Sequence, residues 1–136
     1  MSEQLSQVHE TFEKARASRK NAYAPYSGFR VGAALKTRSG ELYGGCNVEN
    51  ASYGATICAE RGAILSAIAE GGSNDFDHLV VVTSSDPPAV PCALCLQVIS
   101  EFCGGDFPIH LADEEGIRRT VRLGELLPHP FNKIPE

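Results

Sequence analysis

The chain has 136 residues, of which 43% are hydrophobic and 21% are charged, and its formal net charge is −5. This length predicts a single domain over residues 1–136, and the acidic balance argues against a nucleic acid partner, because phosphate backbones are bound by clustered Lys and Arg. No apolar run approaches the ~20 residues of a membrane span, and the segment Met1–Gln4 lacks the basic and apolar regions of a signal peptide, so we expect a cytoplasmic protein without a membrane partner.

The first half of the chain predicts one helix and a β-hairpin. Apolar residues near the N-terminus recur with helical spacing, at Leu5, Val8, Phe12 and Ala15. The segments Phe29–Thr37 and Glu41–Val48 then alternate as two strands around the turn at 38–40. We therefore expect an amphipathic helix followed by two paired strands.

The second half predicts helices that alternate with strands. A helix is expected over Cys58–Glu70, with a Gly-Gly pair at its end, and a buried strand follows over His78–Thr83. Another helix is expected from Cys92, then strands at Pro108–Ala112 and near Thr120–Leu123, and a short final helix. The strand–helix–strand crossover supports a mixed sheet with helices on its faces.

Three cysteines stand at the spacing of metal ligands. Cys92 and Cys95 are three residues apart, so a helix that starts at Pro91 places both thiols on one face, and Cys58 opens the other helix. At such helix N-termini, exposed amides and the helix dipole lower thiol pKa values. Three thiolates with an open fourth position are typical of a catalytic zinc site, and a hydrolytic site needs no redox metal. We expect one Zn²⁺ per chain.

Glu60 lies two residues after Cys58 and therefore on a different side of the first helical turn. Its carboxylate can face the open metal position without being a ligand, and can act there as general base and then as general acid. A zinc-stabilised binding or scaffold protein without catalysis is the alternative from another class. That alternative gives no reason for a carboxylate beside the site, and no fourth ligand stands at motif spacing.

The remaining cysteines, Cys46 and Cys103, are expected in the core, because free cysteine is among the most buried residue types. An odd count of five cysteines favours reduced thiols over a disulfide framework. The chain shows neither a phosphate-binding nor a dinucleotide-binding glycine motif, so we expect no organic cofactor.

Longer segments around these motifs support a family resemblance. They are Tyr26–Leu35, Gly45–Tyr53, Cys58–Arg61, Pro91–Cys95 and Gly124–Pro128. In this order, over roughly residues 23–131, they resemble the small homotetrameric, zinc-dependent cytidine deaminases. A ligand-x-Glu motif followed by Pro-Cys-x-x-Cys is the known signature of zinc deaminases. The resemblance implies a three-layer α/β/α fold with a mixed five-stranded sheet and helices on both faces.

The resemblance also implies a reaction and the residues that perform it. The expected reaction is the hydrolysis of cytidine and 2′-deoxycytidine to the uridines with release of ammonia, in pyrimidine salvage. The cysteines Cys58, Cys92 and Cys95 match the zinc ligands of the family, and Glu60 matches its proton shuttle.

Substrate contacts are implied by matching positions as well. Asn47 and Glu49 match the pair that holds the ribose 3′-hydroxyl, and alternation along an extended segment places both on one face. Phe29 matches the aromatic residue that packs on the pyrimidine, and the backbone of Ala59 is expected to read the base. Three positions match those that a neighbouring subunit contributes in the family, namely Ala51, Tyr53 and Phe131. The family therefore implies a homotetramer whose subunits complete one another's active sites.

The chain departs from the family pattern after its third metal ligand. The usual arginine is replaced by Leu96, so Arg61, which lies near Cys58, is expected to offset the negative charge of three thiolates. We expect zinc to be held, with a bound water that is less acidic than in typical relatives. Ala93 and Leu94 add apolar volume near the leaving amino group, which leaves open a preference for modified or N4-substituted cytosine nucleosides or a cytosine-like antibiotic. The competing interpretation packs Leu94 and Leu96 into the core.

Overall fold

The computed structural model describes residues 3–132 and residue 134. The strands are β1 (Gly32–Thr37), β2 (Leu42–Cys46), β3 (Phe76–Val82), β4 (Pro108–Asp113) and β5 (Gly116–Arg122). The helices are α1 (Glu3–Arg19), α2 (Ala59–Ala69), α3 (Ala93–Phe102) and α4 (Leu123–Leu126), with a 3₁₀ turn, η1, at Tyr53–Ala55. The order of helices and strands is the predicted one, and η1 is added to it.

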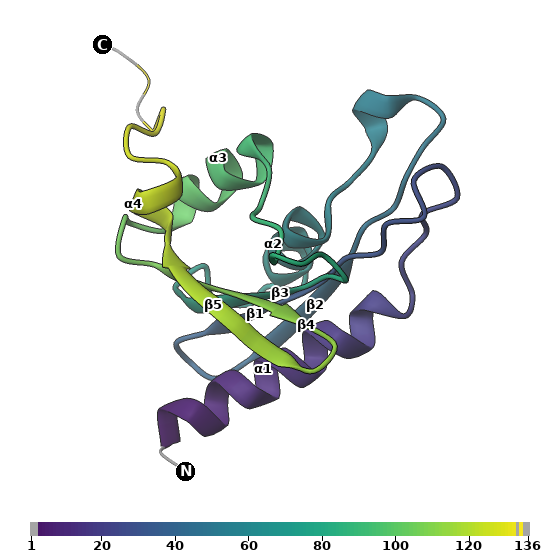
Figure 1. Cartoon of the computed structure of the whole chain (residues 1–136). Helices are drawn as coiled ribbons and strands as arrows, with labels where there is room; N and C mark the ends of the chain where they lie inside the picture. The colour runs from purple at the N-terminus through teal and green to yellow at the C-terminus, as the bar shows by residue number, and fades with distance from the viewer. Residues whose placement is uncertain (1–2, 133, 135–136) are drawn as a thin grey trace.

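The strands form one mixed sheet in the order β2-β1-β3-β4-β5. β3 and β4 run parallel, and the other neighbouring pairs are antiparallel. The parallel pair requires a crossover connection, which contains α3. Figure 1 shows α1 on one face of the sheet and α2 and α3 on the other. The predicted three-layer arrangement is confirmed.

Both faces of the sheet bury an apolar core. On one face, Phe12 and Ala15 of α1 pack against Ala34, Val80 and Val82. On the other, residues of α2 and α3 pack against alternate residues of β1 and β3, in a cluster that includes Leu35, Ala63, Ile64, Leu79, Val81, Leu96 and Ile99. Because β3 is covered on both faces, its sequence is a nearly continuous apolar run rather than an alternating one.

Two glycines determine where α2 lies and where it ends. A Cβ atom at Gly45 of β2 would lie 2.4 Å from the carbonyl oxygen of Ala59 and from the nitrogen of Ala63, so α2 approaches β2 closely only because Gly45 has no side chain. Gly71 has φ 73° and donates to the carbonyl of Ile68, which gives the helix a Schellman-type end. This close contact between α2 and β2 at Gly45 determines the position of the N-terminus of α2.

Several predicted boundaries were wrong by a few residues. β1 begins at Gly32 rather than at Phe29, because the carbonyl of Phe29 and the N–H of Val31 bond to the side chain of Asn47 instead of a partner strand. β5 begins at Gly116, well before the predicted start, because most of its side chains are exposed and leave no apolar pattern. Pro91 precedes the N-cap residue Cys92 instead of opening α3.

The core assignment of Leu94 was also wrong. Leu94 is 64% exposed, whereas Leu96 is 7% exposed and belongs to the core. Residues two apart on a helix are separated by about 200° of rotation around its axis, so Leu94 and Leu96 lie on opposite sides of α3 and cannot both face the sheet. Cys46 and Cys103 are half-buried rather than fully buried.

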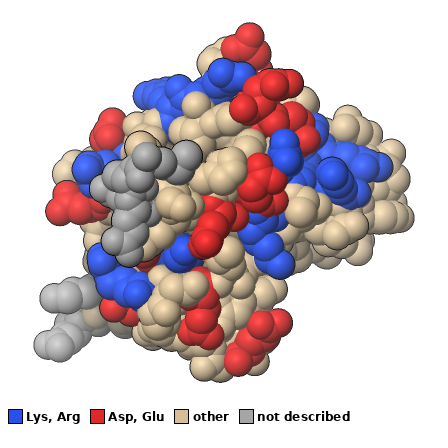
Figure 2. Space-filling model, turned by 90° about the horizontal axis from the view of Figure 1, so that it is seen from below, with Lys and Arg blue, Asp and Glu red and all other residues tan. Residues whose placement is uncertain are grey.

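Acidic and basic side chains are interspersed on the face seen in Figure 2. Ion pairs connect α1 to the rest of the molecule, with Arg19 3.1 Å from Glu114 and Lys36 2.9 Å from Glu10. Among the helices of the described residues, none has both the length and the apolar character of a membrane-spanning segment.

Candidate active site

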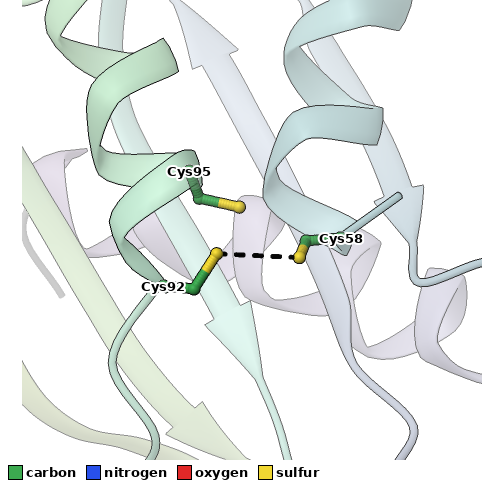
Figure 3. Close-up of side chains that lie close together, drawn as sticks. All are labelled: Cys58, Cys92 and Cys95. Atoms are coloured by element: carbon green, nitrogen blue, oxygen red, sulfur yellow. Dashed lines mark hydrogen bonds between the residues drawn. The ribbon is translucent and has the colours of Figure 1, made fainter. Parts of the chain in front are cut away.

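The three cysteines at metal-ligand spacing meet between the N-termini of α2 and α3 (Figure 3). Cys58 is the N-cap residue of α2 and Cys92 is the N-cap residue of α3, and Cys95 lies in the first turn of α3. The sulfur atoms of Cys58 and Cys92 are 3.8 Å apart, and all three sulfurs lie within 4.8 Å of one another. A zinc tetrahedron with bonds of about 2.3 Å separates its sulfurs by about 3.8 Å, so the spacing fits zinc.

The thiols share their charge unequally. Hydrogen bonding with Cys95, supported by Arg61 and Cys92, lowers the pKa of the Cys58 thiol to about 5. The same hydrogen bond to Cys58, together with burial, raises the pKa of the Cys95 thiol. A thiolate is thus present next to a thiol that donates to it, and a soft cation that binds here replaces the shared proton.

Arg61 supplies positive charge to this cluster. Its Nη2 atom lies 3.3 Å from the sulfur of Cys58 and 3.5 Å from the carbonyl oxygen of Thr56. Its Nε atom is buried and has no hydrogen-bond partner among the described residues. A buried donor without a partner is rare, and here it belongs to a group beside thiols that lose their protons when they hold a metal. The guanidinium therefore fits the role predicted for it, which is to offset thiolate charge.

Glu60 lies in the first turn of α2 and is 5% exposed. Burial raises the pKa of its carboxyl to about 7. A carboxyl group with such a pKa accepts and donates a proton near neutral pH, as general acid–base catalysis requires. Together with Cys58 and Cys92, Glu60 lines a pocket of about 300 Å³.

The pocket brings together the predicted substrate residues that were expected to come from the same chain. Phe29, Asn47, Glu49 and Ala59 all line it. Seven further residues line it without having been predicted, namely Ser27, Val31, Thr56, Val81, Thr83, Ala89 and Val90. Ser27 lies in one of the family-like segments and could have been found there. Val81 and Thr83 carry no such signal, because they reach the pocket only through the position of β3 in the sheet.

Asn47 and Glu49 both contact the loop that precedes β1. The Asn47 amide donates to the carbonyl of Phe29 at 2.8 Å and accepts from the N–H of Val31 at 2.9 Å. The Glu49 carboxylate accepts from the Ser27 hydroxyl and from the N–H groups of Ser27 and Tyr26, and these hydrogen bonds lower the pKa of Glu49. The loop and the 47–49 segment therefore form one hydrogen-bonded wall of the pocket.

Three predicted residues lie outside the pocket of their own chain. Ala51 and Tyr53 are exposed, with Tyr53 84% exposed in η1, and Phe131 is 62% exposed. The side chain of Gln97 in α3 donates to the backbone carbonyl of Phe131. In Figure 1, the loop with η1 and the carboxyl-terminal segment both extend on the side of the sheet that carries α3.

Comparison with known proteins identifies the family. The model of the cytidine and deoxycytidylate deaminase zinc-binding region matches residues 5–111. The chain belongs to this deaminase family. A cytidine deaminase of Sporosarcina psychrophila is 41% identical over 126 residues, which cover 93% of this chain and 92% of the relative. A blasticidin-S deaminase of Bacillus cereus is 30% identical over 111 residues, which cover 76% of this chain and 77% of the relative.

A solved structure agrees with the family assignment. The crystal structure of a cytidine deaminase from Burkholderia pseudomallei has a TM-score of 0.85 and 43% sequence identity, and the match covers 96% of this chain and 100% of that one. The family is one with a zinc-binding region, and the cysteine cluster of this chain fits the same metal.

Proposed function

We propose that this protein hydrolyses cytidine and 2′-deoxycytidine to uridine and 2′-deoxyuridine with release of ammonia, as a step of pyrimidine salvage. The observation that carries the proposal is the junction of the α2 and α3 N-termini, where three cysteine sulfurs stand beside the buried carboxyl of Glu60. The names of its relatives support the same reaction.

Cys58, Cys92 and Cys95 would hold one zinc ion. When bound, zinc supplies Lewis acidity that lowers the pKa of a water molecule toward neutrality. Arg61 offsets the charge of the three thiolates, which together with Zn²⁺ carry one net negative charge. The two helix N-termini add further positive potential at the sulfurs.

Glu60 moves the protons of the reaction. It takes a proton from the attacking water and delivers it to N3 of the pyrimidine as the oxygen bonds to C4. It then carries the proton of the new C4 hydroxyl to the amino nitrogen, which leaves as ammonia. A pKa of about 7 suits both transfers, because the carboxyl holds and releases a proton at similar cost near neutral pH.

The remaining pocket residues would orient the nucleoside. Phe29 packs on the pyrimidine, and the backbone of Ala59 reads the base. The Asn47 amide has a second N–H, beyond the one that bonds to Phe29, and this donor and the Glu49 carboxylate together bind the 3′-hydroxyl. The pocket lining contains two carboxylates and neither Lys nor Arg among the described residues, which favours a substrate without a phosphate group.

We also assign a homotetramer in which Ala51, Tyr53 and Phe131 complete the pocket of a neighbouring subunit. Tyr53 and Phe131 support it, because large side chains with such exposure leave apolar surface in contact with water in an isolated chain. Phe131 is also held at its backbone by Gln97, so its ring projects from a tethered segment.

The alternative of a preference for modified or N4-substituted cytosines rests on apolar bulk at Ala93, Leu94 and Leu96. None of these three residues lines the pocket of the described chain. Leu94 is exposed, and Leu96 faces the core. Cytidine therefore remains the better supported substrate. We also propose that the protein is a single domain in the cytoplasm, and its free thiols support that location.

The proposal is tested with zinc-loaded protein whose metal content has been measured. We expect this protein to convert cytidine to uridine, and the fall in ultraviolet absorbance measures the rate of that conversion. Glu60→Gln should lower kcat by at least about a thousandfold, within the range lost with an essential acid–base group, while one zinc per chain is retained. The control is Glu70→Gln, an exposed residue at the far end of α2, which should keep wild-type kcat.

Two outcomes would contradict these assignments. Activity that survives in Glu60→Gln would remove the proton shuttle. If the zinc-replete wild type is inactive on cytidine, the protein is either a scaffold without catalysis or a deaminase of modified nucleosides. Activity on a panel of N4-substituted cytidines distinguishes these two alternatives.

A further inference from the structure

Ser27 contacts Glu49 and Phe29 at once, although it was not among the predicted site residues. Its hydroxyl donates to Oε2 of Glu49, and its Oγ atom accepts from the backbone N–H of Phe29 at 3.0 Å. All three residues line the pocket. The hydroxyl has one proton, and the N–H of Phe29 occupies one of its lone pairs, so the O–H direction toward Glu49 is set by the backbone.

The hydrogen bonds of Glu49 divide unequally between its two oxygens. Oε1 accepts from the N–H of Tyr26 at 2.9 Å and from the N–H of Ser27 at 3.1 Å. Each carboxylate oxygen has about two lone-pair sites, so these bonds occupy Oε1 fully. Oε2 accepts the Ser27 hydroxyl and keeps one lone pair for a ligand. The acceptor for a substrate hydroxyl is therefore Oε2.

From this arrangement we infer that Ser27 is a positioning residue, which directs the free lone pair of Glu49 Oε2 toward the 3′-hydroxyl of the substrate. The inference rests on the proposed function, because it takes Glu49 as the group that binds the sugar. Without the Ser27 hydroxyl, Oε1 would still be held by the two backbone N–H groups, but Oε2 would lose its fixed donor and exchange that bond with water, so its second lone pair would no longer be directed. The cost should then appear only with a substrate that has a hydroxyl at this position.

A merely structural role for Ser27 predicts something different. A serine that accepts from the N–H two residues later stabilises a turn, and its loss would affect every substrate equally. Ser73 offers a matched control, because its Oγ accepts from the N–H of Asp75 at 3.0 Å, with the same spacing in the chain and away from the pocket.

The test compares 2′-deoxycytidine with 2′,3′-dideoxycytidine, which differ only in the 3′-hydroxyl. For Ser27→Ala we expect kcat/KM to fall about tenfold with 2′-deoxycytidine, mainly through KM, as befits a charge-assisted hydrogen bond. With 2′,3′-dideoxycytidine the fall should stay below about twofold, since the affected contact is absent there. Ser73→Ala should leave both values unchanged, and the thermal midpoints of the two variants should agree.

An equal loss with both substrates, or no loss with either, would overturn the inference and leave the deaminase assignment in place. A wild type that converts both substrates equally well would remove Glu49 from sugar recognition and the inference with it, while deamination stands. A wild type that converts neither would overturn the proposed function itself.

Discussion

At the scale of single residues, the site depends on how charge is balanced around three sulfurs. Hydrogen bonds with Cys95, Arg61 and Cys92 lower the pKa of the Cys58 thiol to about 5, so this sulfur favours the thiolate form at neutral pH. Arg61 is close enough to act directly, at 3.3 Å from the Cys58 sulfur. Since Leu96 is a core residue and not a cation, we propose that Arg61 provides the positive charge that compensates the thiolates.

Replacing Arg61 with Gln should therefore weaken zinc binding, because Arg61 lowers the pKa of the Cys58 thiol, and without it a proton competes more strongly with the metal for that sulfur. We expect the zinc Kd to rise by about 10–100-fold, as for other groups that support metal ligands. The measurement is competition with a chromogenic chelator at constant pH. Arg38→Gln, which removes an exposed arginine paired with Asp75, is the control and should bind zinc as the wild type does. An unchanged Kd in Arg61→Gln would show that the helix N-termini suffice.

At the scale of secondary-structure elements, the site depends on where α2 rests on the sheet. Two glycines lie in this contact and differ in the space around them. A Cβ at Gly45 would overlap the backbone of α2, whereas a Cβ at Gly62 would meet its nearest neighbour, the carbonyl oxygen of Cys46, at an ordinary 3.6 Å. The glycine of the strand is thus required by packing, and the glycine of the helix is not.

Alanine at these two positions should have opposite effects on stability. Gly62→Ala should stabilise the protein by up to about 1 kcal/mol, because alanine loses less backbone entropy in a helix. Gly45→Ala should destabilise it by about 1–3 kcal/mol, since α2 must move away from β2. Denaturant unfolding measures the free energy of unfolding of both variants. All proteins are compared at the same concentration, so that any subunit association contributes equally to each value. Gly45→Ala should also weaken zinc binding by displacing Cys58, and a stable, zinc-binding Gly45→Ala protein would refute the close-contact argument.

At the scale of the whole molecule, the pocket within one chain lacks three of the residues expected in it. The loop that contains η1 and the segment that follows α4 both extend on the α3 side of the sheet (Figure 1). Tyr53 of the first and Phe131 of the second are both exposed. The proposed tetramer accounts for both observations, because each segment would enter the pocket of a neighbour.

Mixing two inactive variants tests this sharing of residues. Phe131→Ala and Glu60→Gln alone should each have low kcat/KM, because every site in a pure assembly lacks one of the two groups. Assemblies formed from both chains together should recover activity, since some sites combine an intact Glu60 with the Phe131 of a neighbour. Native mass spectrometry of the mixture, which resolves the mass difference that Phe131→Ala introduces, confirms that hybrids form. Hybrids without recovered activity, or a fully active Phe131→Ala protein, would remove that residue from the shared site.

The order of residues along the chain was enough to predict the chemical groups of the site and their local placement. Cys92 and Cys95 share a helix face because of their spacing, and Glu60 is separated from Cys58 by the same helical geometry. The apolar run over His78–Thr83 also predicted a buried strand correctly. These features depend on neighbours within one or two helical turns, which a sequence pattern records.

Which distant segments form the pocket, and which side chains they bury, depends on how the helices and strands pack together. Leu94 and Leu96 are both apolar, yet only the position of α3 against the sheet shows which one faces the core. Val81 and Thr83 reach the pocket through the order of strands, and Ser27 meets Glu49 through a loop closed by backbone hydrogen bonds. Contacts between residues far apart in the chain depend on the packing of whole elements, and a local pattern of residue types does not encode that packing.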